Sequence, residues 1–571
     1  MTSDRTQSLD QPVHTFAGPM SQEKRIPASG NEKQDVHSSI NSQLVSDGED
    51  EENWKPGKQE LIIMGTMAVL SIVVSLDATI LVPALPTLAR DLNGTAIETF
   101  WTGTSYLLSN AVFLPFIGAT SEISGRRAAV IFSLVMFTLG TIVCCTANDM
   151  RQLLSGRTIQ GIGGGGIFVM ASIVITDIIP LRQRPQFQGI IAAAWGLGAV
   201  LGPLCGGLFA EHTTWRWLFY INFPFCAIGF VCVPFFQLKL VKERSWSKDL
   251  GRVDWVGGIL FIAGMTTFLL GITWGGVQYS WSSFQTWLPI LLGGLVVILS
   301  LVYEASVPSE PFIRLSVFHN ISAAITFFLT LVQGLIMYAE LYYLPFYLTS
   351  VKQQTPSIAG IFIMAVNIIL FPASIAAGVA MTRYGSFVWV IRAGFMVMAL
   401  GSGLLIYLDE HKSIVSHLFV FLVSGIGLGF LLPSLETASQ AIAQSRNITH
   451  ATAMYIFMRS FGLCVGVATG GTVFSNVFLN TLQDHGVQQA KMIAANSEAF
   501  AETLKDMPAS PEKSMLLSSY VSGFHGVFYL LLALAAFSAI IAFFVKHHDL
   551  NQKLQSGHRV QREEKGVETR V

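Results

Sequence analysis

Charged residues are scarce in this chain. Only 12% of its 571 residues are Asp, Glu, Lys or Arg, and 51% are hydrophobic, whereas soluble globular proteins carry roughly 25% charged residues. The formal net charge is −1 and the sequence has no basic stripe, so we expect no nucleic-acid partner. Apolar stretches of about 20 residues, the length of a membrane-crossing helix, recur along most of the chain. The composition therefore predicts an all-α polytopic membrane protein in contact with a lipid bilayer, because these runs are too long for barrel strands.

Cysteines are few, and all six lie inside apolar runs: Cys144, Cys145, Cys205, Cys226, Cys232 and Cys464. This placement predicts small packing residues, not disulfides or a metal site. No cluster of nucleophile and base or of metal ligands occurs either, so we expect neither a cofactor nor an enzyme. Gly161, Gly163 and Gly166 formally match a dinucleotide-binding motif, but no strand precedes them and the run is apolar, which argues against nucleotide binding.

The chain begins with a polar segment that ends in an acidic run, and it lacks the apolar core of a signal peptide. We interpret residues 1–57 as a disordered cytoplasmic tail and residues 547–571 as a second tail. Hydropathy predicts about fourteen membrane helices between them. The predicted spans are Leu61–Leu85, Thr102–Thr120, Ala128–Ala147, Leu153–Ile179, Phe187–Ala210, Leu218–Phe236, Trp255–Trp274, Leu288–Val307, Ser322–Phe346, Ile358–Met381, Val388–Tyr407, His417–Ile442, Met454–Phe474 and Gly523–Val545.

These spans suggest a division into bundles. We expect a six-helix bundle over residues 58–236, a linker with two extra helices over 237–321, and a second six-helix bundle over 322–546. A long outer loop is expected at 475–520. Alternate loops carry most of the arginines in the short connections, such as Arg126 and Arg127, and this bias predicts that both termini are cytoplasmic. It places the sequon at Asn93 outside, where glycosylation can occur unless the membrane lies too close.

The stretch Trp195–Phe209 combines an apolar composition with regularly spaced glycines. Gly198, Gly202 and Gly206 fall four residues apart, on one face of a helix, where they let a second backbone approach closely. Pro203 removes a backbone donor and is expected to bend the helix. By itself this pattern also fits an ordinary, tightly packed membrane helix.

A few ionisable residues lie inside apolar runs, where charge is costly and usually faces a cavity or a partner. Asp77 and Arg157 fall at similar depths, roughly 10–15 Å below the outer surface at 1.5 Å per residue, so they could pair, for transport or only as a permanent structural salt bridge. Glu340 lies among tyrosines and suits a central cavity. Glu436 and Arg459 lie in the cytoplasmic half, where two interpretations are open: a second pair, or an interfacial position for Glu436.

Several of these segments together resemble signatures of the major facilitator superfamily. The ordered string Gly198, Gly202, Pro203, Gly206 and Gly207 is similar to the antiporter motif in the fifth helix of its drug/proton exchangers. Gly118, Glu122, Gly125, Arg126 and Arg127 resemble the cytoplasmic loop signature, with Glu122 in place of the usual Asp. The resemblance implies a tight turn at the two glycines and arginines that latch the cytoplasmic side by pairing with acidic groups or helix C-termini.

Other segments resemble the fourteen-span family within that superfamily. Arg157 and Gln160 match the fourth-helix motif, whose arginine the family links to proton coupling. Leu76–Ile80 is similar to the first-helix signature, although Val82 stands where the family usually has Asn. Trp215–Pro224 looks like the sixth-helix start of the fungal subgroup. The segment from Gly378 to Gly385 is a degraded copy of the loop that begins at Gly118, as expected for duplicated halves.

The resemblance implies a major facilitator fold of two six-helix halves plus two inserted helices. It also implies proton-coupled export of small amphipathic compounds, such as a toxin, drug or secondary metabolite, by alternating access across the cell membrane. The partners would be a small-molecule substrate, protons and lipid, and we expect a monomer. Alternatives are a vacuolar basic amino acid transporter or a siderophore transporter of the same fold, and, from another class, a membrane sensor without transport.

Overall fold

The computed structural model describes residues 56–81, 84–235, 238–240, 251–275, 278–308, 311–444, 447–495, 497–550 and 558–560. Most of the two predicted tails lies outside these residues, as does Val82. The α-helices are α2 (Lys58–Thr79), α3 (Leu85–Asp91), α4 (Ala96–Ser124), α5 (Arg126–Cys145), α6 (Met150–Ile178), α7 (Arg184–His212), α8 (Trp217–Tyr220), α9 (Asn222–Cys232), α11 (Trp255–Trp274), α12 (Phe284–Ser306), α13 (Ile321–Ser350), α14 (Pro356–Tyr384), α15 (Val388–Leu405), α16 (Ile414–Ile442), α17 (Ile448–Asp484), α18 (Ala490–Ala495), α19 (Ser497–Asp506) and α20 (Pro511–Ile541). Short 3₁₀ turns cover Val233–Phe235, Leu315–Phe318 and Ala542–Phe544.

Thirteen helices of the described residues are long and apolar enough to cross a membrane. They correspond to thirteen of the fourteen predicted spans. The remaining span, Leu218–Phe236, is a shorter apolar element in which α8 and α9 are separated at Ile221. The prediction of an all-α membrane fold is confirmed, with one small addition: β1 (Leu238–Leu240) pairs antiparallel with β2 (His558–Val560).

The predicted outer loop 475–520 is wrong in its form. Helix α17 continues to Asp484, α18 and α19 follow, and α20 already begins at Pro511. The reason is a set of apolar side chains that the hydropathy window averages away. Phe474, Phe478 and Leu482 recur every four residues and are buried, and the ring of Phe478 lies 4.3 Å from that of Tyr520 in α20. Burial of this stripe therefore extends both helices beyond the predicted spans.

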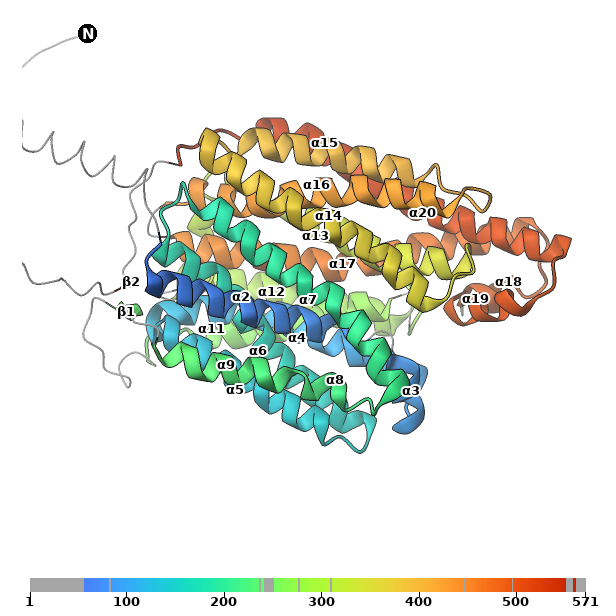
Figure 1. Ribbon diagram of the computed structural model, residues 1–571, viewed down its shortest axis with the longest axis horizontal. Helices are drawn as coiled ribbons and strands as arrows, with labels where there is room; N and C mark the ends of the chain where they lie inside the picture. The colour runs from blue at the N-terminus through green and yellow to red at the C-terminus, as the bar shows by residue number, and fades with distance from the viewer. Residues whose placement is uncertain are drawn as a thin grey trace, which may run out of the picture. The chain divides into compact units, whose positions relative to one another are not determined.

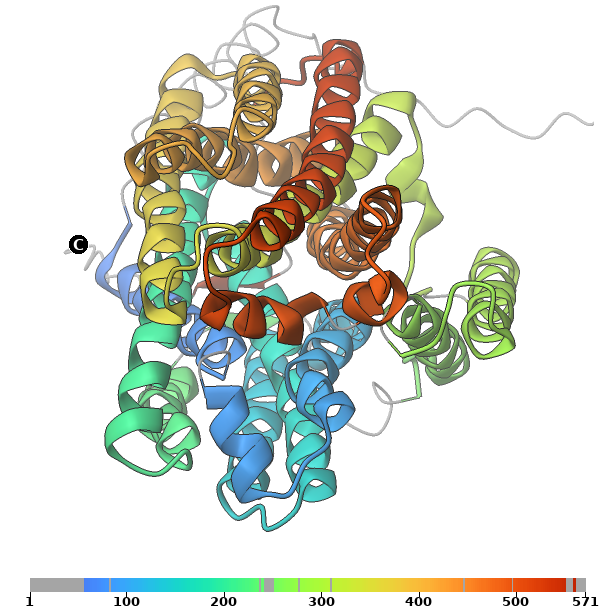
Figure 2. The same ribbon diagram turned by 90° about the vertical axis from the view of Figure 1, so that its right-hand side faces the viewer.

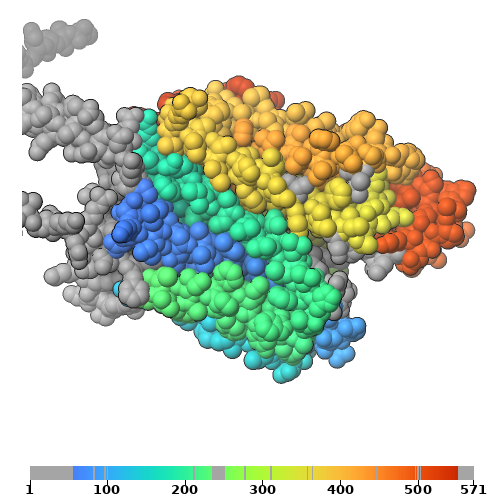
Figure 3. Space-filling model, in the orientation of Figure 1, coloured from blue at the N-terminus to red at the C-terminus, as the bar shows by residue number. Residues whose placement is uncertain are grey.

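The helices pack as two groups. Helices α2–α9 are called the N-terminal bundle below, and α13–α20 the C-terminal bundle (Figure 1). Helix α7 packs on both α2 and α14, and it lies between them on the face seen in Figure 3. Helices α4 and α17 form the other extensive contact between the bundles. The end of the bundles where Gly125 lies is the predicted cytoplasmic end and is called the cytoplasmic end below.

The inserted pair α11 and α12 packs on itself and stands on one flank of the bundles (Figure 2). Aromatic rings attach α11 to both bundles. The ring of Trp255 lies 5.6 Å from Phe116 in α4, and that of Phe261 lies 5.5 Å from Phe457 in α17. The pair thus touches the two bundles at the seam between α4 and α17.

Candidate functional site

The structure contains an ion pair between Asp77 and Arg157 inside the N-terminal bundle. Arg157 Nη1 lies 2.5 Å from Asp77 Oδ2, and both side chains have 0% exposure. Gln160 Nε2 and Asn222 Nδ2 donate to the other carboxylate oxygen at 2.9 and 2.7 Å. Both oxygens of the Asp77 carboxylate, which lies on α2, therefore have partners, and these partners come from α6 and α9.

The arginine is equally well surrounded. Arg157 donates through Nε to Thr102 O at 3.2 Å and through Nη1 to Gln160 Oε1 at 2.8 Å. Its guanidinium lies 4.2 Å from the ring centre of Tyr106. This arrangement satisfies most of the polar atoms that burial would otherwise leave unpaired. We call the group of Asp77, Arg157, Gln160 and Asn222 the α2–α6 network.

The glycine face of α7 packs directly on α2, next to this network. A Cβ at Gly198 would collide with Ile72 O, one at Gly202 with Thr79 Oγ1, and one at Gly206 with Ile80 O. The close approach predicted for these three glycines is therefore present. Gly207 differs, because a Cβ there would meet nothing within 4 Å. Pro203 lies within α7 and is half-buried.

At the cytoplasmic end, Arg126 joins three helices. Its Nε lies 2.7 Å from Asp177 Oδ2 at the end of α6, and Nη1 donates to Ser121 Oγ at 2.7 Å. Nη2 donates to Thr449 Oγ1 of α17 at 2.9 Å. The guanidinium is 2% exposed, so this contact between the bundles is shielded from solvent.

Glu122 makes a second contact between the bundles. Its Oε1 lies 3.5 Å from His450 Nδ1 in α17, and its Oε2 lies 3.6 Å from Arg314 Nη2. Arg184 Nη1 of α7 also reaches Gln440 of α16 at 3.4 Å. Arg127, which we predicted to pair with an acidic group or a helix C-terminus, is exposed instead, and the described residues contain no ion pair to it. It follows Arg126 on the helix and points elsewhere, since successive residues are about 100° apart.

The two signature glycines have different roles. Gly125 has φ 87° and separates α4 from α5, as predicted for a tight turn. Gly118 was predicted to serve the same turn, but it lies within α4, where a Cβ would be 3.0 Å from Ala453 Cβ of α17. The degraded copy in the C-terminal bundle repeats this division. Gly385 ends α14 with φ 65°, and a Cβ at Gly378 would collide with Pro185 O of α7.

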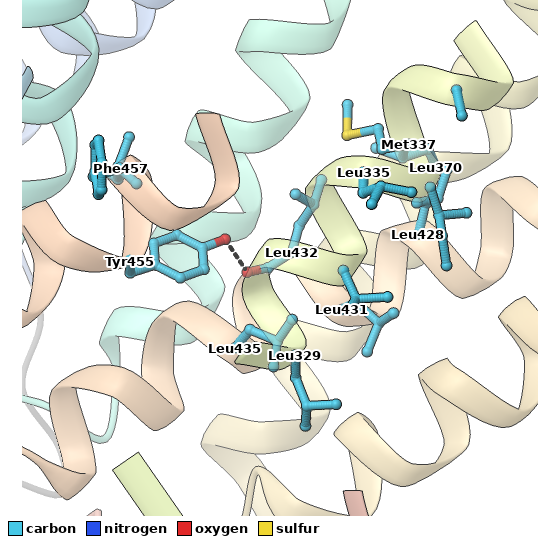
Figure 4. Packing of buried hydrophobic residues seen from close by; sticks show 14 of the residues in the cluster. Leu329, Leu335, Met337, Leu370, Leu428, Leu431, Leu432, Leu435, Tyr455 and Phe457 are labelled. Atoms are coloured by element: carbon cyan, nitrogen blue, oxygen red, sulfur yellow. Dashed lines mark hydrogen bonds between the residues drawn. The ribbon is translucent and has the colours of Figure 1, made fainter. Parts of the chain in front are cut away.

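A small cavity lies between the two bundles, lined by α6, α7, α16 and α17. Glu436 and Arg459 both line it, together with Trp195 and Phe168. Figure 4 shows the packing beside it, where the Tyr455 hydroxyl of α17 donates to Leu432 O of α16 at 3.0 Å. The cavity volume is about 30 Å³, far below the roughly 300–1,000 Å³ of drug-sized binding sites. The cavity is therefore too small for a drug-sized ligand in this conformation.

The predicted pairing of Glu436 with Arg459 is absent, because no ion pair within 4 Å joins them in the described part of the chain. Arg459 instead lies 5.4 Å from the Trp195 ring centre and 5.7 Å from that of Phe168. Glu436 is buried, and its Oε1 has no hydrogen-bond partner.

Glu340 lies apart from this cavity, within the C-terminal bundle. Ser424 Oγ of α16 donates to its Oε2 at 2.5 Å, and its Oε1 has no partner. It is 2% exposed. The predicted carboxylates thus occupy three separate environments, one inside each bundle and one between them.

Sequence reasoning missed several partners of these groups. It named no role for Asn222, Tyr106, Asp177, Thr449 or His450, although Asp177 stands at the cytoplasmic end of an apolar run, where a charge is unusual. The other four carry no such signal, because polar residues at helix ends and aromatic residues within apolar runs are both common.

Comparison with known proteins agrees with this architecture. The family model described as Major Facilitator Superfamily matches residues 67–467. The chain is 36% identical over 507 residues to "MFS transporter L2" of a Phoma species, covering 88% of this chain and 85% of the relative. It is 30% identical over 522 residues to "Efflux pump FUS6" of Gibberella moniliformis, covering 90% and 92%.

Solved structures share the fold at low sequence identity. The proton:xylose symporter XylE superposes with a TM-score of 0.55 at 13% identity, covering 86% of this chain and 97% of that one. The human organic anion transporter MFSD10 has a TM-score of 0.55 at 14% identity, covering 84% and 100%. With thirteen long apolar helices among the described residues, two bundles and these relatives, the chain belongs to the major facilitator superfamily and is a multi-pass membrane transporter.

Proposed function

We propose that this transporter exports small amphipathic compounds, such as a toxin or secondary metabolite, in exchange for protons. Two observations support this proposal. Relatives that match about 90% of the chain bear the name efflux pump. The bundles are joined at the cytoplasmic end by the Arg126–Thr449 hydrogen bond, which is the observation that carries the proposal, and the cavity between them is too small for such a compound. Such contacts must break before a ligand can enter from the cytoplasm, as alternating access requires.

Proton coupling needs a buried carboxylate that can change its charge. We propose Asp77 for this role, with Arg157 and Gln160 as the groups that hold it when it is ionised. A proton on Asp77 would weaken its bond to Arg157 and loosen α2 from α6. Glu340 is the second candidate, because Ser424 is its hydrogen-bond donor and the carboxylate has no cation within 4 Å among the described residues.

We also propose that the protein resides in the cell membrane, as a monomer, with Asn93 outside. Asn93 is exposed between α3 and α4, which supports access to a glycosylating enzyme. The sequon threonine, Thr95, caps α4 by accepting from Glu98 N at 3.2 Å. A mobility shift on glycosidase treatment that is absent in Asn93→Gln would test this placement. A vacuolar location would instead be recognised by transport activity in isolated vacuoles and not across the surface of whole cells.

Expression in a strain that lacks its own pumps tests the proposed function. A panel of toxins and metabolites is screened for reduced intracellular accumulation, with and without a protonophore. We expect at least one compound to be exported, and the protonophore to abolish that export. Export that persists with the protonophore would contradict proton coupling. Uptake in place of export would contradict the direction.

A further inference from the structure

The arginine in the cavity between the bundles has no carboxylate partner. Arg459 is 8% exposed, and no Asp or Glu oxygen lies within 4 Å of it in the described residues. Its neighbours are the Met337 sulfur at 3.9 Å, two aromatic rings, and the Tyr455 hydroxyl. The rings of Trp195 and Phe168 can cover the faces of a guanidinium, but its donors point along its edges.

A donor in the same cavity has no hydrogen-bond partner at all. Gln188 is 3% exposed, and its Oε1 accepts from Thr437 Oγ1 at 3.0 Å. Its Nε2 has no hydrogen-bond partner. A buried donor without an acceptor costs stability, so Gln188 and Arg459 together are what a site for an acceptor-rich ligand group would contain.

The cavity also holds Glu436. Whether a negatively or a positively charged ligand is favoured depends on which of the two groups, the Glu436 carboxylate or the Arg459 guanidinium, keeps its charge. A proton can neutralise a carboxylate, whereas a guanidinium keeps its charge under all conditions in a protein. Glu436 Oε1 is enclosed by protein and unpaired. The cationic and polar groups near it are Arg184, Arg459, Ser172 and Tyr455. Among the described residues that line the cavity, Arg459 is therefore the one whose charge is permanent.

We propose that the ligand of this cavity carries a carboxylate on an aromatic or apolar body. Arg459 binds the carboxylate, Gln188 supplies a further donor, and Trp195 and Phe168 flank the body. A planar guanidinium matches a carboxylate with two parallel hydrogen bonds. The cavity must widen to admit the ligand, because its present volume of about 30 Å³ holds only one or two water molecules. This inference names the substrate class of the proposed exporter and rests on that function.

Binding to the purified full-length protein tests the inference without a proton gradient. The probes are naphthaleneacetic acid, its methyl ester, and naphthylmethylamine, and the readout is quenching of tryptophan fluorescence. We expect the wild-type protein to bind the acid about ten- to a hundredfold more tightly than the ester, as for a charge-assisted hydrogen bond. Arg459→Gln should reduce this ratio to about one while ester binding remains, which also shows that the variant is folded. Arg459→Lys should give an intermediate ratio, because lysine keeps the charge but not the planar fork.

Arg383→Gln is the matched control, because Arg383 is exposed on α14 and does not line this cavity. It should keep the wild-type ratio. Equal affinities for acid and ester, tighter binding of the amine, or no binding of the acid to the wild-type protein would each overturn the inference. Failure of the proposed function looks different, since the acid would then bind with the expected preference but would not be exported under a proton gradient.

Discussion

Two arginine–carboxylate sites of this transporter differ in how completely they are satisfied. In the α2–α6 network, Asp77 and Arg157 are 2.5 Å apart, have 0% exposure and bond to other residues of the same bundle. In the cavity, Arg459 and Glu436 are not paired within 4 Å, and their neighbours come from both bundles. We call the α2–α6 network the saturated site, because its charges are paired with each other and change only when a proton or a mutation breaks the pair. We call Arg459 and Glu436 the unsaturated site, because these two charges are not paired with each other and can respond to a ligand.

The largest expected effect comes from neutralising the saturated site. Asp77→Asn should stop export against a gradient while downhill exchange of substrate persists, because the proposed proton carrier is gone. Breaking a buried pair typically costs about 3–5 kcal/mol, but Arg157 keeps Thr102 O and Gln160 Oε1 as acceptors. We therefore expect the protein to reach the membrane. Transport in inverted vesicles, with and without a pH gradient, measures the outcome.

Asp91→Asn is the control for this prediction, because Asp91 is an exposed carboxylate beyond α2, with 43% side-chain exposure. It should transport normally. Proton-driven accumulation at the wild-type level in Asp77→Asn would exclude Asp77 as a required carrier and favour Glu340. Loss of the variant from the membrane would instead indicate that the pair only holds the fold.

The seam between α2 and α7 should be nearly as sensitive. Gly202→Leu places a large side chain against Thr79 and Leu76 of α2, so the two backbones must separate. We expect export to be lost at normal membrane abundance. Gly207→Leu is a matched control, because nothing lies within 4 Å of a Cβ there. Equal export by the two variants would show that close packing on α2 is not required.

The unsaturated site should give an effect of opposite sign on stability. Glu436→Gln replaces a buried carboxylate whose Oε1 has no partner by a neutral amide, and an unsatisfied buried charge costs more than an unsatisfied neutral group. We expect the melting temperature of the purified protein to stay the same or to rise, whereas Asp77→Asn should lower it. A decrease in Glu436→Gln as large as in Asp77→Asn would mean that the two carboxylates are held equally well.

The smallest effect is expected at the contact that closes the cytoplasmic end. Thr449→Val removes one hydrogen bond of Arg126, about 1 kcal/mol or a roughly fivefold shift toward an open cytoplasmic end. Arg126 keeps Asp177 and Ser121. Maleimide labelling of Ser172→Cys in inverted vesicles, in a background without native cysteines, should become correspondingly faster.

Thr452→Val is the control for this measurement. Thr452 is also buried on α17 but donates to Ile448 O of its own helix at 2.9 Å. Its replacement should leave the labelling rate unchanged. An unchanged rate in Thr449→Val would show that this hydrogen bond does not hold the cytoplasmic end closed.

The sequence predicted those features that can be read from positions along each helix, such as depth and spacing. The depth of Asp77 and Arg157 follows from counting residues along two spans, and the glycine face of α7 follows from the four-residue spacing. Both the ion pair and the close contact are present in the structure. Hydropathy located thirteen long helices for the same reason.

Features that depend on which helices are neighbours were not predictable in this way. Asn222 reaches Asp77 only because α9 packs on α2, and Thr449 reaches Arg126 only because α17 meets α4. The motif assigned Gly118 to a turn. The structure shows a different reason for a glycine at this position, which is the proximity of Ala453 in the C-terminal bundle. Arg459 was paired with Glu436 by depth alone, but its rotation about α17 directs it to Trp195.

Gly118 and Gly378 occupy matching positions in the two repeats, and each removes a side chain where one bundle touches the other. Gly118 of α4 faces Ala453 of α17, and Gly378 of α14 faces the backbone of α7 at Pro185. A larger side chain at either position would have to push the two bundles apart, because a Cβ would lie 3.0 Å from Ala453 Cβ at Gly118 and would collide with Pro185 O at Gly378. The distance between the bundles at these two places is therefore limited by the absence of a side chain.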